Sequence, residues 1–298
     1  EVNVPKVLAQ VRNESYAHYA WPSAARPLFE RHGTVLAIGT TLAFALFVLG
    51  FAALNEPGAF WTAHLSPGRF YSLMPHNVMI TIFGAAFLWM LVAIGMGARA
   101  FWKDTGVAEV AAADHGKAAH DAARLTYLDG GGQGCFNEDE RPNDHRRLWH
   151  HFTFYGFLLC FASTSVATIY HYLVGWSAPY AWWDIPPLLG IAGGIGLVVG
   201  TVGLTSAKAG RLADLRSTDF RGMEYGFILI LFLTGATGLA LRVLGETMLL
   251  GPLLALHLGA VLTFFLTMPY GKFVHGLYRY LALSRYAHDR RKANTTEA

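Results

Sequence analysis

Long apolar segments without charge alternate with charged segments along the whole chain. Each apolar segment is about long enough to cross a bilayer as a helix, the fifth only if Arg242 lies at the interface. Backbone groups in lipid must be bonded internally, which leaves helices or a closed barrel, and the alternating pattern of a barrel is absent. The pattern predicts an all-α, polytopic membrane helix bundle with six transmembrane helices. The windows without Asp, Glu, Lys or Arg are 34–54, 72–98, 148–173, 186–206, 225–241 and 251–270.

Composition and charge agree with this topology. Hydrophobic residues make up 53% of the chain and charged residues only 14%. Of the 23 Lys and Arg, all but Arg69 and Arg242 fall on one side of a six-helix topology, so the positive-inside rule places both termini in the cytoplasm. We divide the chain into a cytoplasmic N-terminal linker (1–33), a transmembrane domain (34–280) with a cytoplasmic loop at about 99–146, and a cytoplasmic tail (281–298). We expect membrane lipid, and no nucleic acid, as a partner.

Two histidines, His257 and His275, bracket an almost uncharged apolar segment that includes most of the last window, and they are the first candidates for chemistry. On one continuous helix they share a face and lie about 27 Å apart, near the two edges of the membrane core. Pro269 lies between them and would bend the helix, so this phase holds only approximately. Imidazoles inside a membrane are costly and usually functional, and haem iron is one of their commonest partners.

The third apolar window supplies histidines at both of its ends. Because the third and sixth helices run in opposite directions, His150 or His151 would pair with His275 on the cytoplasmic side, and His171 with His257 on the outer side. Helical phase places His150 about 60° and His151 about 160° from His171, which favours His150 as the ligand. His151 would then face a headgroup, a haem propionate or a neighbouring helix.

We therefore predict His150, His171, His257 and His275 as the metal ligands of one or two bis-histidine haems b. A single membrane histidine near a helix end is more often an anchor or a hydrogen-bonding group, but four histidines matched in depth favour a cofactor. The haem would be non-covalent, because no Cys-x-x-Cys-His motif is present.

Two further residues are candidates for the cofactor sites. His76 opens the second window at the outer face, where it could replace His171 or His257 as a ligand. Lys272 precedes His275 by one turn. It either donates to a quinone carbonyl in the cytoplasmic half or serves as a positive anchor that pairs with lipid headgroups or a haem propionate.

Three stretches also carry a family resemblance: YLDGGGQGCFNEDERPNDHRRLWHHFTFYGFLLCFAST, APYAWW and LLALHLGAVLTFFLTMPYGKFVHGLYR. They closely resemble the membrane part of the TcuB (CitB) family of tricarballylate and citrate utilisation proteins. More distantly, they are similar to the cytochrome b (gamma) subunit of respiratory nitrate reductase and to heterodisulfide-reductase-type membrane subunits. In the nitrate reductase cytochrome a second histidine follows the position of His150 by ten residues, and this chain has Cys160 there. The outer ligands are thus open between His171 and His76, or there is a single haem.

The resemblance implies a redox bridge in the bacterial inner (cytoplasmic) membrane. Such a protein reoxidises the flavin of a tricarballylate dehydrogenase-like partner and passes electrons through iron–sulfur centres and haem b to the quinone pool. The opening EVNVPKVLAQVRNESYAHYAWP resembles the linker that follows the family's cysteine-rich part. With only Cys135 and Cys160, this chain cannot supply the thiolates of an iron–sulfur cluster, so we expect clusters only in a missing N-terminal part or a partner.

Two other functions fit the membrane pattern. One is a transporter that uses histidines for proton or metal movement, although the intramembrane carboxylates of a proton relay and an inverted repeat are not evident. The other is a haem-free membrane anchor for a dehydrogenase. Electron transfer by a subunit of a quinone-reducing oxidoreductase, with no catalytic residues of its own, is the function that we expect.

Overall fold

The computed structural model describes residues 4–56, 58–65, 68–106, 109–128, 135–136, 142–143, 145–209 and 221–296. Six of its helical segments are long and apolar enough to cross a membrane, so the hydropathy prediction is confirmed and the chain is a multi-pass, all-α membrane protein. The six are α3 (His32–Leu54), α5 (His76–Asp104), α7 (His145–Ile169) with the π-helical turn η4 (Tyr170–Val174), α8 (Ile185–Ala209), α9 (Arg221–Leu244) and α10 (Leu250–Thr267) with the 3-10 turn η6 (Met268–Tyr270).

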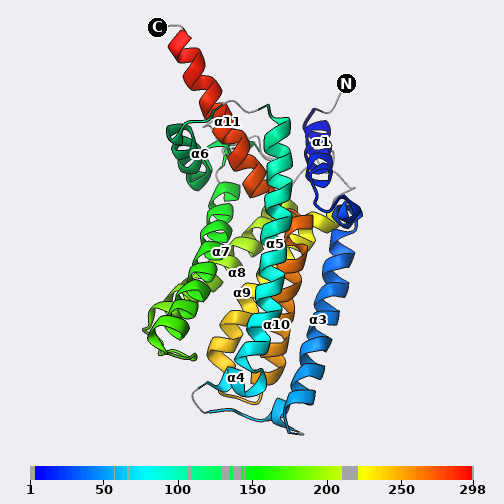
Figure 1. Ribbon diagram of the computed structural model, residues 1–298, viewed down its shortest axis with the longest axis vertical. Coiled ribbons are helices and arrows are strands. Elements are labelled where there is room, and N and C mark those ends of the chain that lie inside the picture. Colours follow the sequence, from blue (N-terminus) through cyan, green and yellow to red (C-terminus); the bar gives the residue numbers. More distant parts are fainter. Residues whose placement is uncertain are drawn as a thin grey trace.

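The six segments run alternately down and up in one bundle, with both chain termini at the same end (Figure 1). We call this end of the bundle the upper end and the opposite end the lower end. Short elements connect the helices at the lower end: η2 (Ala59–Trp61) and α4 (Arg69–Leu73). The six windows read from the sequence therefore correspond one to one to the observed segments.

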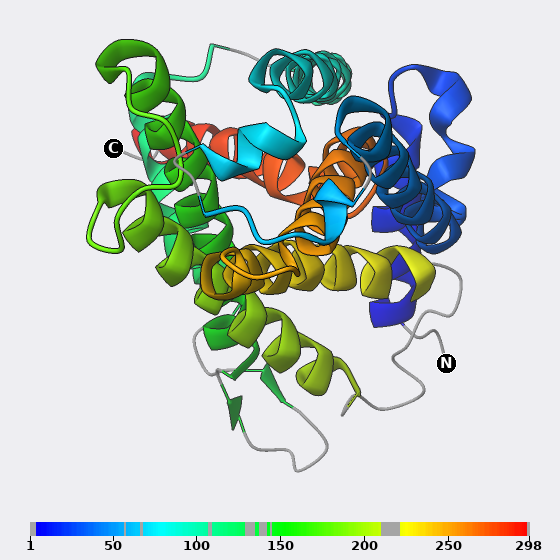
Figure 2. The same cartoon turned by 90° about the horizontal axis from the view of Figure 1, so that it is seen from below.

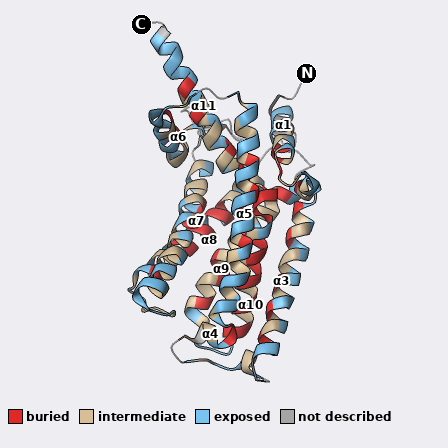
Figure 3. Cartoon of the chain, in the orientation of Figure 1, coloured by how far each residue is buried: buried red, intermediate tan, exposed pale blue. Residues whose placement is uncertain are grey.

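Helix α10 is the central helix of the bundle. It packs against α3, α5 and α9, and the view from below shows it inside the ring formed by the other helices (Figure 2). In its span 61% of the residues are buried, against 33% or less in the other five, as expected for helices that turn one face to lipid. Buried residues accordingly gather along α10 and on the inner faces of its neighbours (Figure 3).

Helices α7 and α8 form the closest pair, and glycines make this approach possible. A Cβ on Gly156 would lie 2.7 Å from the backbone nitrogen of Leu197, and one on Gly193 would lie 2.7 Å from that of Cys160. Further up, Gly203 lies against the indole ring of Trp149. Small residues that let two backbones approach are the usual means of helix association in membranes. This glycine seam fixes α7 against α8.

The segment between His257 and His275 is not one continuous helix, which corrects the sequence interpretation. Helix α10 ends at Thr267, η6 follows, and a new helix, α11 (Val274–Thr296), carries His275. Pro269 has no N–H to continue the helical ladder, and Gly271 is extended with φ −144° and ψ −166°. The two histidines thus lie on different helices, so the common face that we predicted does not exist.

Helices also form in the segments that we predicted as linker, loop and tail. The upper end carries α1 (Val4–His18), η1 (Ser23–Ala25), α2 (Pro27–Glu30), α6 (Ala112–Arg124), η3 (Thr126–Leu128) and α11. Strands β1 (Cys135–Phe136) and β2 (Pro142–Asn143) form one antiparallel pair of two residues each. Helix α6 packs on α11, so the loop between α5 and α7 is tied to the C-terminal helix.

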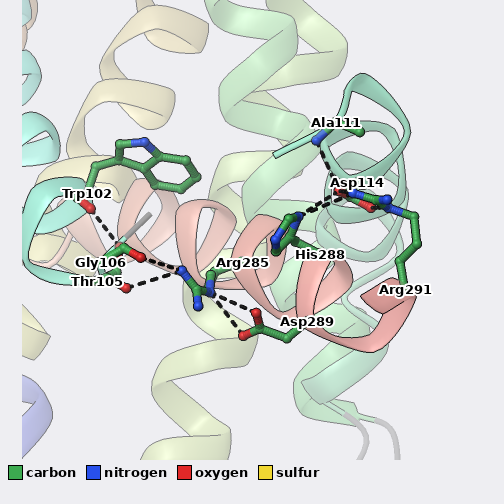
Figure 4. Close-up of polar contacts among 9 residues, drawn as sticks. All are labelled: Trp102, Thr105, Gly106, Ala111, Asp114, Arg285, His288, Asp289 and Arg291. Carbon is green, nitrogen blue, oxygen red and sulfur yellow. Dashed lines mark hydrogen bonds and ion pairs between the residues drawn. The ribbon is translucent and has the colours of Figure 1, made fainter. Parts of the chain in front are cut away.

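Charged side chains hold α6 and α11 together (Figure 4). The Asp114 carboxylate accepts two hydrogen bonds of 2.9 Å from Arg291 and lies 3.5 Å from His288. The hydrogen bonds from Arg291 lower the pKa of Asp114 to about 2. A second arginine, Arg285, bonds Asp289 and the carbonyl of Gly106 at the end of α5. The bidentate pair between Arg291 and Asp114 is the stronger contact, because Asp114 is only 4% exposed.

We expect Gly156→Ala to destabilise the bundle. Its Cβ would meet backbone atoms of α8, which cannot rotate away, so the change should cost about 1–3 kcal/mol and lower the melting temperature in detergent by several degrees. The matched control is Gly84→Ala in α5, where nothing lies within 4 Å of the new Cβ and alanine is the better helix former. Equal melting temperatures for the two variants would show that the glycine seam does not limit stability.

We also expect Asp114→Asn to release α6 from α11. Cleavage of the connection between α5 and α6 by a broad-specificity protease should then become several-fold faster. Asp289→Asn is the control, because its carboxylate is half exposed and such pairs contribute little. The folded pKa of Asp114 lies below the unfolded value near 4, so the contact is complete above about pH 4 and is lost as the pH falls toward 2. Unchanged cleavage in the Asp114 variant would contradict this role.

Candidate functional site: histidine pairs at the two ends of the bundle

The upper end brings together His150 of α7 and His275 of α11. Their ring centroids lie 6.0 Å apart, and the rings are inclined at 78°. A metal–imidazole bond is about 2 Å long and the ring centre lies about 1 Å beyond the nitrogen, so two imidazoles on one iron have centres about 6 Å apart. The spacing of this pair fits a bis-histidine metal site. The neighbour His151 turns toward Tyr155 instead, with ring centroids 5.9 Å apart.

The hydrogen bonding of the upper pair leaves nitrogen atoms for a ligand. Nδ1 of His275 contacts the backbone carbonyl of Lys272. An imidazole nitrogen that faces a carbonyl carries the proton and donates it, which leaves Nε2 with its lone pair, the usual arrangement of a metal-binding histidine. Nδ1 of His150 is buried without a hydrogen-bond partner. Both rings are held in the bundle, and Nδ1 of His150 is not satisfied by protein atoms.

A charged bridge holds the segment in front of His275. Glu224, at the start of α9, forms ion pairs with Lys208 at the end of α8 and with Lys272. All three side chains are largely buried, with exposed fractions of 18–23%. The Lys272 ammonium is thus paired with a carboxylate, and the Lys272 carbonyl orients the His275 ring. Sequence analysis missed Glu224, because it lies just outside the charge-free window.

Phenylalanines fill the bundle directly below the upper pair. Phe157 of α7 lies 5.6 Å from Phe273 and 5.8 Å from Phe264, measured between ring centroids. Phe157 lies about two turns from His150 along α7, and Phe273 lies less than one turn before His275. Edge-to-face aromatic contacts of this kind pack densely and exclude water. The upper pair is therefore bounded by apolar rings on the side that faces the membrane interior.

The lower end brings together His76 of α5 and His171 of η4. Their ring centroids are 3.8 Å apart, and the ring planes are nearly parallel, with an angle of 26° between them. This is a stacking distance, too short for an iron between the two rings. Tyr71 lies edge-on to His76 at 4.9 Å, and Nδ1 of His171 is buried without a hydrogen-bond partner. The lower pair in this geometry does not fit a bis-histidine haem.

His257 has a different environment from the one that depth matching predicts. Its Nδ1 lies 2.9 Å from the hydroxyl of Thr237 in α9, and Gly238 provides the space for its ring. His171, its expected partner, stacks on His76 instead. Of the sequence-predicted candidates, the structure thus brings together His150 with His275 and His76 with His171, and it places His257 against α9. Thr237 was missed, because a lone threonine in an apolar helix gives no signal in the sequence.

The number of potential metal ligands that lie together limits the kind of metal that could bind among the described residues. Within them, no group of three or more His, Cys, Asp and Glu side chains could hold a metal ion. A structural or catalytic zinc site usually needs at least three protein ligands, whereas a haem takes only two because the porphyrin supplies four nitrogens. Two imidazoles therefore fit the ligand number of a haem better than that of a zinc site.

Together, the fold and this site define a multi-pass helical membrane protein with one imidazole pair spaced for a metal at one end of the bundle. The family model of citrate utilization protein B matches residues 30–296. Citrate utilization protein B of Escherichia coli is 42% identical over 292 residues, which cover 98% of this chain and 76% of that protein. The chain therefore belongs to the citrate utilization protein B family. No solved structure matches it.

Proposed function

We propose that this protein transfers electrons in a bacterial inner membrane during citrate or tricarballylate utilisation. Electrons from a cytoplasmic flavoprotein dehydrogenase would pass through one haem b at the upper end to the quinone pool. The observation that supports this most directly is the 6.0 Å separation of the His150 and His275 rings. Membership of the citrate utilization protein B family supports the metabolic setting.

The residues of the upper pair have separate roles in this proposal. His150 and His275 would hold the haem, and the Lys272 carbonyl keeps the proton of His275 on Nδ1. When bound, haem b supplies a one-electron carrier whose potential depends on its axial ligands and surroundings. The phenylalanines below the pair exclude water from its membrane side. Iron–sulfur clusters, where the pathway needs them, are supplied by another polypeptide or by a further part of the protein.

Orientation follows from the same charge pattern that marks the upper end. Both termini, α6 and α11 lie at this end (Figure 1), and the ion pair between Asp114 and Arg291 joins α6 to α11. We place the upper end in the cytoplasm, where a soluble dehydrogenase can reach it. The haem site would then lie close to the cytoplasmic face, within reach of its electron donor.

The proposal is tested by a reduced-minus-oxidised visible spectrum of the purified protein. We expect a low-spin haem b spectrum that is lost or becomes high-spin in His150→Ala and in His275→Ala, because each change removes one axial ligand. His151→Ala is the matched control, since its ring faces Tyr155 and should leave the spectrum intact. A folded wild-type protein without a Soret band would exclude haem and leave the membrane-anchor function.

A second measurement concerns the number of haems. We expect one haem per chain, and we expect His171→Ala and His257→Ala to keep the full haem content, because the lower pair is stacked and His257 is bonded to Thr237. Pyridine haemochrome analysis against protein concentration gives the ratio. A ratio of two that falls to one in His171→Ala would place a second haem at the lower end and contradict the single-site proposal.

A further inference from the structure

The first turn of α3 packs closely against the start of α9, the helix that carries Glu224. A Cβ on Gly33 would lie 3.0 Å from both the Cα and the carbonyl oxygen of Gly222, and a Cβ on Gly226 would lie 3.3 Å from the Cα of Gly33. Glycines at these positions allow the two backbones to come into contact. The position of the neighbouring residue, His32, is therefore fixed relative to α9.

The ring of His32 lies in the break between α10 and α11. It donates a hydrogen bond to the backbone carbonyl of Tyr270, and the donor is Nε2, because Nδ1 has no partner. A Cβ on Gly271 would collide with Cε1 and Nε2 of the same ring. His32 thus holds two consecutive residues of the break, the first through a hydrogen bond and the second through direct packing.

A histidine at position 32 is not explained by stability alone. The residue is only 1% exposed, and its Nδ1 is buried without a hydrogen-bond partner. A buried polar atom without a partner lowers the stability of the folded state. Local losses of this kind are typical of residues that serve a function. The part of His32 that does bond to protein is the part that faces the break, so its role is to be sought there.

The break is held on both sides of Gly271. His32 fixes the backbone in front of it, and Glu224 holds Lys272 behind it through an ion pair. Glycine leaves the backbone more conformational freedom than any other residue, so contacts on both sides are needed to fix the direction of the chain. The next carbonyl, that of Lys272, contacts Nδ1 of His275. The direction of the chain at Gly271 therefore decides how the His275 ring is held.

We infer that His32 is a positioning residue for the proposed haem ligand His275. Its contacts with the break set the direction of the Lys272 carbonyl. This carbonyl keeps the proton of His275 on Nδ1, so that Nε2 carries the lone pair that a metal needs. Outer groups that orient a metal-binding imidazole typically change metal affinity by about 10–100-fold when they are removed. The inference rests on the proposed function for the identity of the metal group.

The test uses variants of the full chain that separate the hydrogen bond of His32 from its bulk. His32→Phe keeps a ring but has no donor, whereas His32→Gln places an amide N–H close to the position of Nε2. Tyr270→Phe is the matched control, because it removes the hydrogen bond from the Tyr270 hydroxyl to the Trp21 carbonyl and leaves the Tyr270 carbonyl in place. If His32→Phe does not fold, His32→Asn replaces it, since its amide ends one atom short of Nε2.

We expect His32→Phe to raise the haem dissociation constant of the haem-depleted chain about tenfold. It should also convert the single Nδ1–H tautomer of His275 into a mixture, measured by the imidazole ¹⁵N shifts of histidine-labelled, haem-free protein. His32→Gln should restore both properties. Tyr270→Phe should lower the melting temperature as His32→Phe does, but it should keep the wild-type haem affinity and tautomer. A merely structural role of His32 would not produce this difference.

Two results would overturn the inference. One is a wild-type haem affinity together with a single His275 tautomer in His32→Phe. The other is an equal loss of haem affinity in His32→Phe, His32→Gln and Tyr270→Phe, which would mean that general loosening of the bundle causes the effect. Because the tautomer is measured without haem, a wild-type protein that binds no haem would refute the proposed function, and the His32 variants would still decide whether His32 positions His275.

Discussion

The connection between α10 and α11 decides where the candidate chemistry of this protein lies. Pro269 ends the helical ladder, Gly271 is extended, and Lys272 is held by Glu224, so the chain changes direction before His275. A side chain at position 271 would collide with the His32 ring, so glycine is required there for packing. If α10 continued as a straight helix, the Lys272 carbonyl would be used within the helix and would not orient His275.

Hydropathy predicts the six spans because lipid imposes one simple requirement on each of them. A span must be apolar and must bond its own backbone, and both properties can be read locally in the sequence. The break at Pro269 could be read only as a bend, since a proline in a membrane helix is compatible with continuation. Helices α6 and α11 escaped the analysis because neither carries a long apolar window, which was the signal used.

The candidate site was predictable where helical phase decides it and not where helix neighbours decide it. Phase within one helix favours His150 over His151, and His150 is the one that faces His275. Position along the predicted spans put His171, His76 and His257 at a similar depth in the membrane. A similar depth does not determine which helices are neighbours. Helix α10 packs against α9, so His257 meets Thr237, whereas His171 meets His76 of α5. Such neighbour relations depend on the packing of the whole bundle.

A pair of axial ligands must be held on both sides, and the upper end of the bundle does this through a closed series of contacts. The glycine seam fixes α7, which carries His150, against α8. Lys208 at the end of α8 pairs with Glu224 of α9, and Glu224 pairs with Lys272 beside His275. The two imidazoles thus belong to one rigid loop of helices, although they are far apart in the sequence. In the lower pair, His171 lies in a π-helical turn at the end of its helix. Preorganisation of this kind is what a cofactor site needs, because each ligand must keep its position without the metal.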